Sequence, residues 1–176
     1  MRIIAGSRKG ATIYAPKADT RPTGDRVREA AFNLIGPVDD MAVLDLFAGS
    51  GAMGLEALSR GASTAVFVEA DREAQRAIER NAHKLELTGA TLLRMDARRA
   101  LAAEAAAGRR YDLVLVDPPY AMFEYLQPTL ATYLPALLAE DGLVVVETAK
   151  RDHPELPPLA ERTSRTYGSA RLTLFE

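Results

Sequence analysis

From residue 42 onward, short apolar segments alternate with longer segments in which apolar residues recur every three or four positions. The short segments have the length of buried strands and lie at residues 42–47, 64–69, 90–95, 112–117 and 142–148. The longer segments have the spacing of amphipathic helices and lie at residues 52–60, 71–87, 97–107 and 123–139. Residues 162–175 predict two more strands, separated by a turn at Gly168 and Ser169. This alternation predicts an α/β fold, a mostly parallel sheet with helices on both faces.

The first 35 residues follow a different pattern. Two short apolar stretches, residues 3–4 and 12–14, flank a basic turn that contains two glycines, which predicts a β-hairpin. A loop rich in proline and glycine follows, and a helix is expected from Asp25. We therefore expect residues 1–24 to extend from a single domain over residues 25–176, whose core would stay covered without the hairpin.

Length and composition fit one globular domain. The 176 residues are 48% hydrophobic and 26% charged, which is ordinary for a soluble protein. Cysteine is absent, which excludes disulfides and thiolate zinc sites, and two histidines are too few for a histidine metal cluster. We therefore expect no metal. The longest apolar run is far shorter than the roughly 18 residues of a membrane span, so we expect a cytoplasmic location without membrane contact.

Charge is unevenly distributed along the chain. The net charge is −2, which argues against indiscriminate coating of polyanions. Residues 1–35, however, carry seven basic and three acidic side chains, whereas the rest of the chain carries 15 basic and 21 acidic ones. The basic front is a candidate surface for phosphate groups, which arginine binds better than lysine because it forms two parallel hydrogen bonds.

A glycine-rich motif follows the first predicted strand. Gly49, Gly51 and Gly54 satisfy the G-x-G-x-x-G pattern, and acidic Glu69 ends the next strand. The pattern is typical of dinucleotide binding, although a tight glycine turn without a ligand is an alternative. Asp45 changes the interpretation, because an anionic side chain there would repel a pyrophosphate but suits an ammonium or sulfonium group. S-adenosylmethionine carries both groups and no phosphate, and Glu69 could bind the ribose hydroxyls of either ligand.

A second motif, Asp117-Pro118-Pro119-Tyr120, follows the fourth predicted strand. The prolines remove two N–H donors and leave carbonyl oxygens that can only accept hydrogen bonds. With the Asp117 carboxylate they form an acceptor pair suited to an –NH₂ group, and the Tyr120 ring offers a face for a planar group. Accepting protons from the exocyclic amine of a base localises its lone pair, which makes it a better nucleophile. A Pro-Pro pair that merely ends a strand is the alternative interpretation.

Two other aspartates precede predicted helices. Asp96 could accept a hydrogen bond from an adenine amino group, and it could equally cap the helix expected from Ala97; both roles can coexist. Asp71 is expected to cap the helix over residues 71–87. The chain has no G-x-x-x-x-G-K-[ST] motif, which excludes the P-loop class of nucleoside triphosphate hydrolases.

With both motifs placed, residues 45–51 and 117–120 together resemble an amino-directed class I S-adenosylmethionine methyltransferase. Further segments resemble the RsmD family, the bacterial 16S rRNA guanine-N2 methyltransferases, and lie at residues 2–6, 20–23, 25–29, 32–33 and 54–62. The Asp-Pro-Pro-Tyr motif is shared with adenine-N6 and cytosine-N4 methylases, whereas the Thr-Arg-Pro-Thr segment at residues 20–23 is much more specific. The resemblance covers essentially the whole chain.

The resemblance implies a Rossmann-like class I methyltransferase fold, with a seven-stranded, mostly parallel sheet. Asp117, Pro118, Pro119 and Tyr120 would form the catalytic amine site. The residues expected to contact S-adenosylmethionine are Arg26, Asp45, Phe47, Ala48, Gly49, Ser50, Gly51, Glu69, Ala70, Asp96 and Ala97, with Arg26 or Arg28 available to the donor carboxylate. The residues expected to contact rRNA are Arg2, Arg8, Lys9, Arg21 and Arg28.

The implied reaction is transfer of a methyl group to the exocyclic N2 of a guanine in 16S rRNA, with S-adenosylhomocysteine as the product. The partner would be the free rRNA or the small ribosomal subunit, and the enzyme would act as a monomer. Three alternatives remain from the residues themselves. They are another amino-directed methylase, acting on adenine-N6 in DNA or glutamine-N5 in a protein; an NAD-dependent oxidoreductase; and an rRNA-binding module without catalytic activity.

Overall fold

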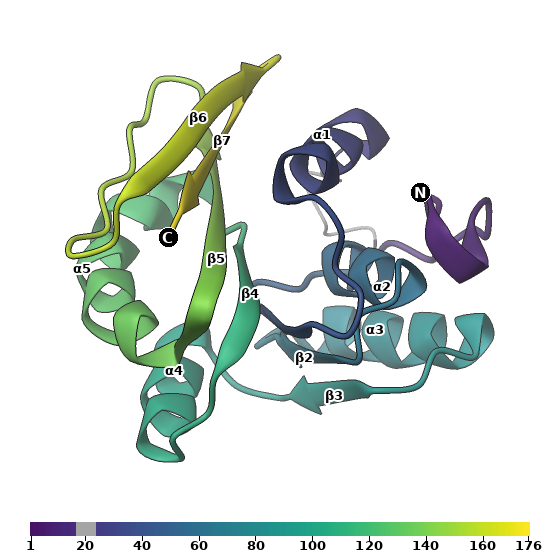
Figure 1. Cartoon of the computed structure of the whole chain (residues 1–176). Coiled ribbons are helices and arrows are strands. Elements are labelled where there is room, and N and C mark those ends of the chain that lie inside the picture. The colour runs from purple at the N-terminus through teal and green to yellow at the C-terminus, as the bar shows by residue number, and fades with distance from the viewer. Residues whose placement is uncertain (17–23) are drawn as a thin grey trace.

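The computed structural model describes residues 1–16 and 24–176, and its centre is a seven-stranded sheet (Figure 1). The strands are β1 (Ala42–Asp45), β2 (Thr64–Val68), β3 (Ala90–Leu93), β4 (Tyr111–Val116), β5 (Leu138–Ala149), β6 (Glu161–Tyr167) and β7 (Ala170–Phe175). They lie in the order β3-β2-β1-β4-β5-β7-β6. Strands β1 to β5 pair in parallel, and β7 is antiparallel to both neighbours. The predicted sheet is therefore confirmed.

Helices cover both faces of the sheet. They are α1 (Asp25–Ile35), α2 (Ala52–Ser59), α3 (Arg72–Leu85), α4 (Ala97–Ala106) and α5 (Tyr120–Leu137). Successive strand residues point to opposite faces. Val43 of β1 therefore joins the apolar cluster beneath α1, α2 and α3, and its neighbour Leu44 joins the cluster beneath α4 and α5. The central strands β1, β4 and the second half of β5 are buried on both sides, which explains why they appear in the sequence as short continuous apolar runs.

The bounds of the elements agree closely with the prediction, except around α5 and β5. Helix α5 begins at Tyr120 rather than residue 123, because Pro119 takes the N-cap position directly after the β4 turn. Strand β5 begins at Leu138 rather than residue 142, and a register shift follows its first pairing with Tyr111. The early start of α5 places Tyr120 in the first turn of a helix. In residues 1–16 and 24–176 no helix is long and apolar enough to cross a membrane.

The N-terminal segment pairs with itself as a hairpin but packs against the domain. The Ile3 N–H donates to the Ala11 carbonyl at 2.9 Å, and the turn between them contains a short 3-10 helix, η1 (Gly6–Arg8). Ile3 and Ile13 are both buried in the cluster beneath α1 and α2. The expectation that the core would stay covered without the hairpin is therefore wrong.

The tip of this hairpin is fixed against the C-terminal ends of α2 and α3. Gly6 has a φ of +80°, and a Cβ there would lie 1.8 Å from the Ser59 carbonyl oxygen. The Arg8 guanidinium donates from Nε to the Leu85 carbonyl and from Nη2 to the Glu86 carbonyl. Because α2 starts beside the carboxyl end of β1 and runs back along the sheet, the tip lies away from the carboxyl ends of the strands.

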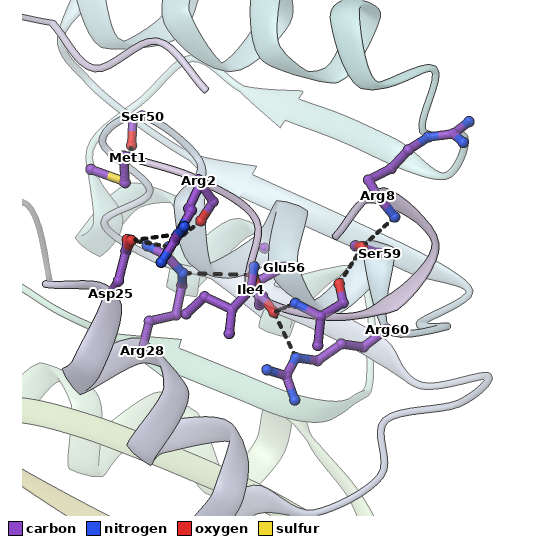
Figure 2. Close-up of polar contacts among 12 residues, drawn as sticks. Met1, Arg2, Ile4, Arg8, Asp25, Arg28, Ser50, Glu56, Ser59 and Arg60 are labelled. Atoms are coloured by element: carbon purple, nitrogen blue, oxygen red, sulfur yellow. Dashed lines mark hydrogen bonds and ion pairs between the residues drawn. The ribbon is translucent and has the colours of Figure 1, made fainter. Parts of the chain in front are cut away.

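The buried Glu56 carboxylate of α2 joins the N-terminal segment to α2 and α1 (Figure 2). Its two oxygens accept hydrogen bonds from Ile4 N at 2.8 Å and Ala5 N at 2.9 Å. Arg60 Nε donates to Oε1 at 2.8 Å, and Nε of Arg28 lies 3.7 Å from Oε2. A buried charge needs such partners, and here they come from three separate segments of the chain. Glu56 therefore holds these segments together.

Arg28 belongs to the core rather than to the surface. Its side chain is 0% exposed, and its Nη2 donates to Asp25 Oδ1 at 2.8 Å and to the Arg2 carbonyl. The structure therefore contradicts the predicted contacts of Arg28 with rRNA or with the donor carboxylate. The side chain instead links α1 to the N-terminal segment and to Glu56.

Replacing Glu56 by alanine should lower the free energy of unfolding by about 3–5 kcal/mol, because the Arg28 charge and two backbone N–H groups would lose their buried acceptor. Equilibrium unfolding in urea measures the change. The matched control is Glu29→Ala, which removes an exposed carboxylate from α1 and should change stability by no more than about 0.5 kcal/mol. A small, equal effect of both substitutions would contradict the role of Glu56.

Candidate active site

The turn from β1 to α2 is held by the last residue of the strand. Asp45 accepts a hydrogen bond from Gly54 N through Oδ2 at 2.9 Å, so its carboxylate binds an N–H in the first helical turn. Gly51 is the N-cap of α2 and has a φ of +82°, which a glycine adopts without strain. At Gly54 a Cβ would lie 2.3 Å from the Phe67 ring of β2. The glycines thus let the helix start close to the sheet.

Glu69, directly after β2, binds the same turn from the other side. Its Oε2 accepts a hydrogen bond from Gly49 N at 2.9 Å, and its Oε1 accepts one from Asp71 N at 2.8 Å. Gly51 N donates to the Ala48 carbonyl at 2.6 Å. A pyrophosphate site needs N–H groups of such a turn as donors, but those of Gly49, Gly51 and Gly54 are bound by acceptors of the protein. The turn therefore suits a ligand without phosphate.

Asp45 is buried beside two other acidic side chains. Burial raises the pKa of its carboxyl to about 7, with smaller contributions from Asp117 and Glu69, against the lowering effect of the Gly54 N–H. The three acidic residues follow or end β4, β2 and β1, where the strand order reverses and open α/β sheets bind ligands. A cationic group bound here would favour the ionised form of Asp45.

Two further aspartates cap the helices that start at this edge. Asp96 Oδ1 accepts a hydrogen bond from Arg99 N at 3.1 Å and is the N-cap of α4. Asp71 Oδ1 accepts one from Ala74 N at 2.9 Å and is the N-cap of α3. Both predicted caps are confirmed. Oδ1 of Asp96 accepts the hydrogen bond of the helix cap. Oδ2 is the other hydrogen-bond acceptor of this carboxylate.

The Asp-Pro-Pro-Tyr motif forms the turn from β4 to α5. The Pro119 carbonyl accepts a hydrogen bond from Met122 N at 2.8 Å, so it belongs to the first turn of the helix. The acceptor pair for an amine is therefore best formed by the Asp117 carboxylate and the Pro118 carbonyl. The sequence-based prediction likewise assigns the amine to the Asp117 side chain and the Pro118 carbonyl.

Tyr120 is oriented by a strand that the motif does not include. Its hydroxyl donates to Oε1 of Glu147 at 3.3 Å, and Glu147 is buried near the end of β5. The contact holds the Tyr120 ring between the start of α5 and the edge of the sheet. The aromatic face predicted for a planar substrate group thus has a fixed support.

One pocket of about 780 Å³ brings both motifs together at the carboxyl edge of the sheet. All four residues of the predicted amine site line it. The predicted donor residues that line it are Asp45, Phe47, Ala48, Gly49, Ser50, Glu69, Ala70, Asp96 and Ala97. Two motifs 60 residues apart in sequence therefore share one cavity, as the order of the strands requires.

Several predicted contacts lie elsewhere. Gly51 is buried behind the pocket wall, and Arg26 is exposed on α1 without lining the pocket. Arg2 and Lys9 are exposed, although Arg2 Nε also lies 3.5 Å from Asp25 Oδ2. Arg21, together with the rest of the Thr-Arg-Pro-Thr segment, lies outside the described residues.

The structure adds pocket residues that the motifs did not indicate. Met1 reaches the pocket because the hairpin is docked, and its Sδ lies 3.7 Å from Ser50 Oγ (Figure 2). Arg98 reaches it from the first turn of α4, and Tyr125 from the second turn of α5. Helices that follow parallel strands of one sheet start at the same edge, and this is the sequence signal that could have identified them.

The charges in the pocket favour a cationic or neutral ligand over a phosphate. Five carboxyl groups line it, from Asp45, Glu69, Asp71, Asp96 and Asp117, against one basic side chain, Arg98, among the described lining residues. A dinucleotide would place its pyrophosphate among these acidic groups. The pocket therefore disfavours the NAD-dependent alternative on electrostatic grounds as well as through its bound N–H groups.

Comparison with known proteins gives full-length matches. The family model described as "Conserved hypothetical protein 95" matches residues 1–176. The YlbH protein of Bacillus subtilis (strain 168) is 40% identical over 185 residues, covering 100% of this chain and 98% of that protein. Ribosomal RNA small subunit methyltransferase D of Escherichia coli (strain K12) is 38% identical over 151 residues, 84% of this chain and 74% of that protein.

The solved structure of yhhF from Escherichia coli superposes with a TM-score of 0.87 at 33% identity, covering 99% of this chain and 96% of that chain. With the observed strand order, this likeness confirms the predicted Rossmann-like class I methyltransferase fold. The pocket thus lies at the carboxyl ends of the strands, which is where open α/β sheets bind their ligands.

The raised pKa of Asp45 predicts how stability depends on pH. The unfolded carboxyl titrates near 3.8 and the folded one near 7, so the unfolded state releases its proton first as pH rises. Relative to the Asp45→Asn variant, the wild type should lose stability between about pH 4 and pH 7, by at most about 1.4 kcal/mol per pH unit. Urea unfolding across this range measures it. Parallel pH curves for the two proteins would show that the carboxyl titrates normally.

Proposed function

The chain belongs to the family of conserved hypothetical protein 95, the RsmD family predicted from its sequence, and from that membership we propose that it methylates the exocyclic N2 of a guanine in 16S rRNA. S-adenosylmethionine is the proposed methyl donor. The observation that carries the proposal is the Asp117–Pro118 acceptor pair opening into a pocket lined by acidic side chains.

The donor half of the pocket fits S-adenosylmethionine by its charge and its hydrogen-bonding groups. Each Glu69 oxygen accepts one backbone N–H and retains a lone pair for a ribose hydroxyl. Asp96 offers an acceptor to the adenine amino group, and Asp45 offers a carboxylate to the positively charged end. When bound, the donor supplies an electrophilic methyl group on a sulfonium.

The target half of the pocket activates an amine. The Asp117 carboxylate and the Pro118 carbonyl accept the two N–H groups of an exocyclic –NH₂, which turns its lone pair out of conjugation and towards the methyl group. The methylated nitrogen then gives up one of these protons, to the Asp117 carboxylate or to water. Such an aligned, charge-assisted pair is worth the most in a site that excludes water. The Tyr120 ring, held by Glu147, supports the flat face of the base.

The target guanine must leave its stack to reach the pocket, which costs a few kcal/mol that binding has to offset. The relative from Escherichia coli bears the name ribosomal RNA small subunit methyltransferase D, which supports an rRNA substrate of the small subunit for this chain. Exposed Arg2 and Lys9 are proposed rRNA contacts, while Arg8 contributes mainly to the docking of the hairpin.

Replacing Asp117 by alanine should reduce turnover by at least about 100-fold, because the amine loses its charged acceptor in the transition state. Transfer of a labelled methyl group from S-adenosylmethionine to unmodified small-subunit rRNA measures turnover. Calorimetry with S-adenosylhomocysteine should show donor affinity within a few-fold of wild type. The matched control is Glu124→Ala, which removes an exposed carboxylate from α5 outside the pocket and should leave both quantities unchanged.

Two outcomes would overturn the assignment. If Asp117→Ala destroyed donor affinity while the bound enzyme turned over normally, Asp117 would belong to the donor half and the amine site would be wrong. If the wild-type protein bound NAD but not S-adenosylhomocysteine, the reaction class itself would be wrong.

A further inference from the structure

The outer rim of the pocket carries an aromatic ring that the proposed reaction does not use. In the described part of the chain the exposed large hydrophobic side chains are Tyr14, Met122 and Tyr125, and the last two line the pocket. Tyr125 is 68% exposed and lies three residues after Met122, so both project from the same side of α5. Exposed apolar groups gathered at the mouth of a pocket indicate a binding surface.

Arg98 of α4 lies against this ring. Its guanidinium carbon is 4.6 Å from the centre of the Tyr125 ring, and its Nη1 donates to the Tyr125 hydroxyl at 2.5 Å. None of the ion pairs among residues 1–16 and 24–176 involves Arg98, so no carboxylate there neutralises it. The pair therefore offers a positive charge and a largely exposed ring at one place.

Among the described residues two other arginines lie over aromatic rings, and neither pair combines an arginine outside the ion pairs with an exposed ring at the pocket. Arg60 covers Phe32, but Arg60 is ion-paired with Glu56 and the Phe32 ring is buried. Arg80 covers Tyr14, but neither residue lines the pocket. The Arg98–Tyr125 pair is thus distinguished by its position at the pocket rather than by the ring contact itself.

We propose that Tyr125 and Arg98 bind the nucleotide next to the target guanine in the RNA strand, an inference that rests on the proposed function. The base of that nucleotide stacks on the exposed part of the Tyr125 ring, and its phosphate pairs with the Arg98 guanidinium. Aromatic stacking combined with a nearby cation is how proteins hold unpaired nucleotides without reading their sequence. Arginine adds two parallel hydrogen bonds to a phosphate.

The charge distribution of the pocket explains why this subsite lies at the rim. Of the five carboxyl groups in the lining, Asp71 and Asp96 are exposed like Arg98. Asp45 is buried and Glu69 and Asp117 are half-buried; these three repel phosphate from the interior, whereas Arg98 attracts it from its exposed position. The uncharged target base can enter alone while the backbone stays outside. Tyr125 lies five residues beyond Tyr120, about 7.5 Å along the helix axis, which is within reach of an adjacent nucleotide.

The test combines kinetics with binding of unmodified small-subunit rRNA. Tyr125→Leu removes the ring and should raise the KM for rRNA about 5- to 150-fold, the range measured for single stacked bases. Tyr125→Phe keeps the ring and should stay close to wild type. Affinity for S-adenosylhomocysteine should be unchanged in both variants, because the subsite does not touch the donor.

Arg98→Ala should lower rRNA affinity and reduce the slope of log affinity against log salt by about 0.7, the value for one phosphate contact on a single strand. The matched control is Arg99→Ala, which removes the same charge one residue along α4, where the exposed side chain does not line the pocket. This control should retain the wild-type slope.

Three results would overturn the inference: equal effects of Tyr125→Leu and Tyr125→Phe, equal effects of Arg98→Ala and Arg99→Ala, or a loss of donor affinity in the Tyr125 variants. The last result would place the pair in the donor half of the pocket. Failure of the proposed function would be seen in the wild type. The wild-type protein would then transfer no methyl group to rRNA, independently of how the variants bind rRNA.

Discussion

The hydrogen bond from Gly54 N to the Asp45 carboxylate connects the sheet to the site. It joins the last residue of β1 to the first turn of α2, where the strand order reverses. Burial of this carboxyl is costly, as its raised pKa of about 7 shows, and the Gly54 N–H offsets only part of that cost. A cationic ligand, such as the proposed donor, would offset a further part, because it would favour the ionised form. The buried charge that weakens the free protein would then also select the ligand.

Short-range sequence patterns predicted the features that depend on residues close together in the chain, such as the strands and the acidic residues at their ends. The ends of β1, β2 and β4 carry Asp45, Glu69 and Asp117, and parallel pairing brings them to one edge. The hairpin was mispredicted because its basic, glycine-containing turn indicates exposure. Its burial instead depends on Glu56, about 50 residues away, which no local pattern reveals. Arg28 was mispredicted for the same reason, since its partners come from other segments.

The proposed reaction brings a polyanion to an acidic pocket, and the positions of the charges are compatible with it. The carboxyl groups of Asp45, Glu69 and Asp117 are buried or half-buried in the lining, where a cationic donor and a neutral base would lie. The basic group Arg98 lies at the rim, and exposed Arg2 and Lys9 lie on the N-terminal segment. In the proposed complex the backbone of the nucleic acid stays outside while a single base enters. This requires base extrusion, because a stacked base cannot reach the interior of the pocket.

The central claim is that this site methylates the N2 amine of a guanine in small-subunit rRNA. Mass spectrometry of nucleosides from that rRNA tests it most directly, in cells that lack the protein and are complemented with either the wild type or the Asp117→Ala variant. We expect N2-methylguanosine to be reduced without the protein, restored by the wild type and not restored by the variant. Restoration by the variant, or a change confined to N6-methyladenosine, would contradict the claim.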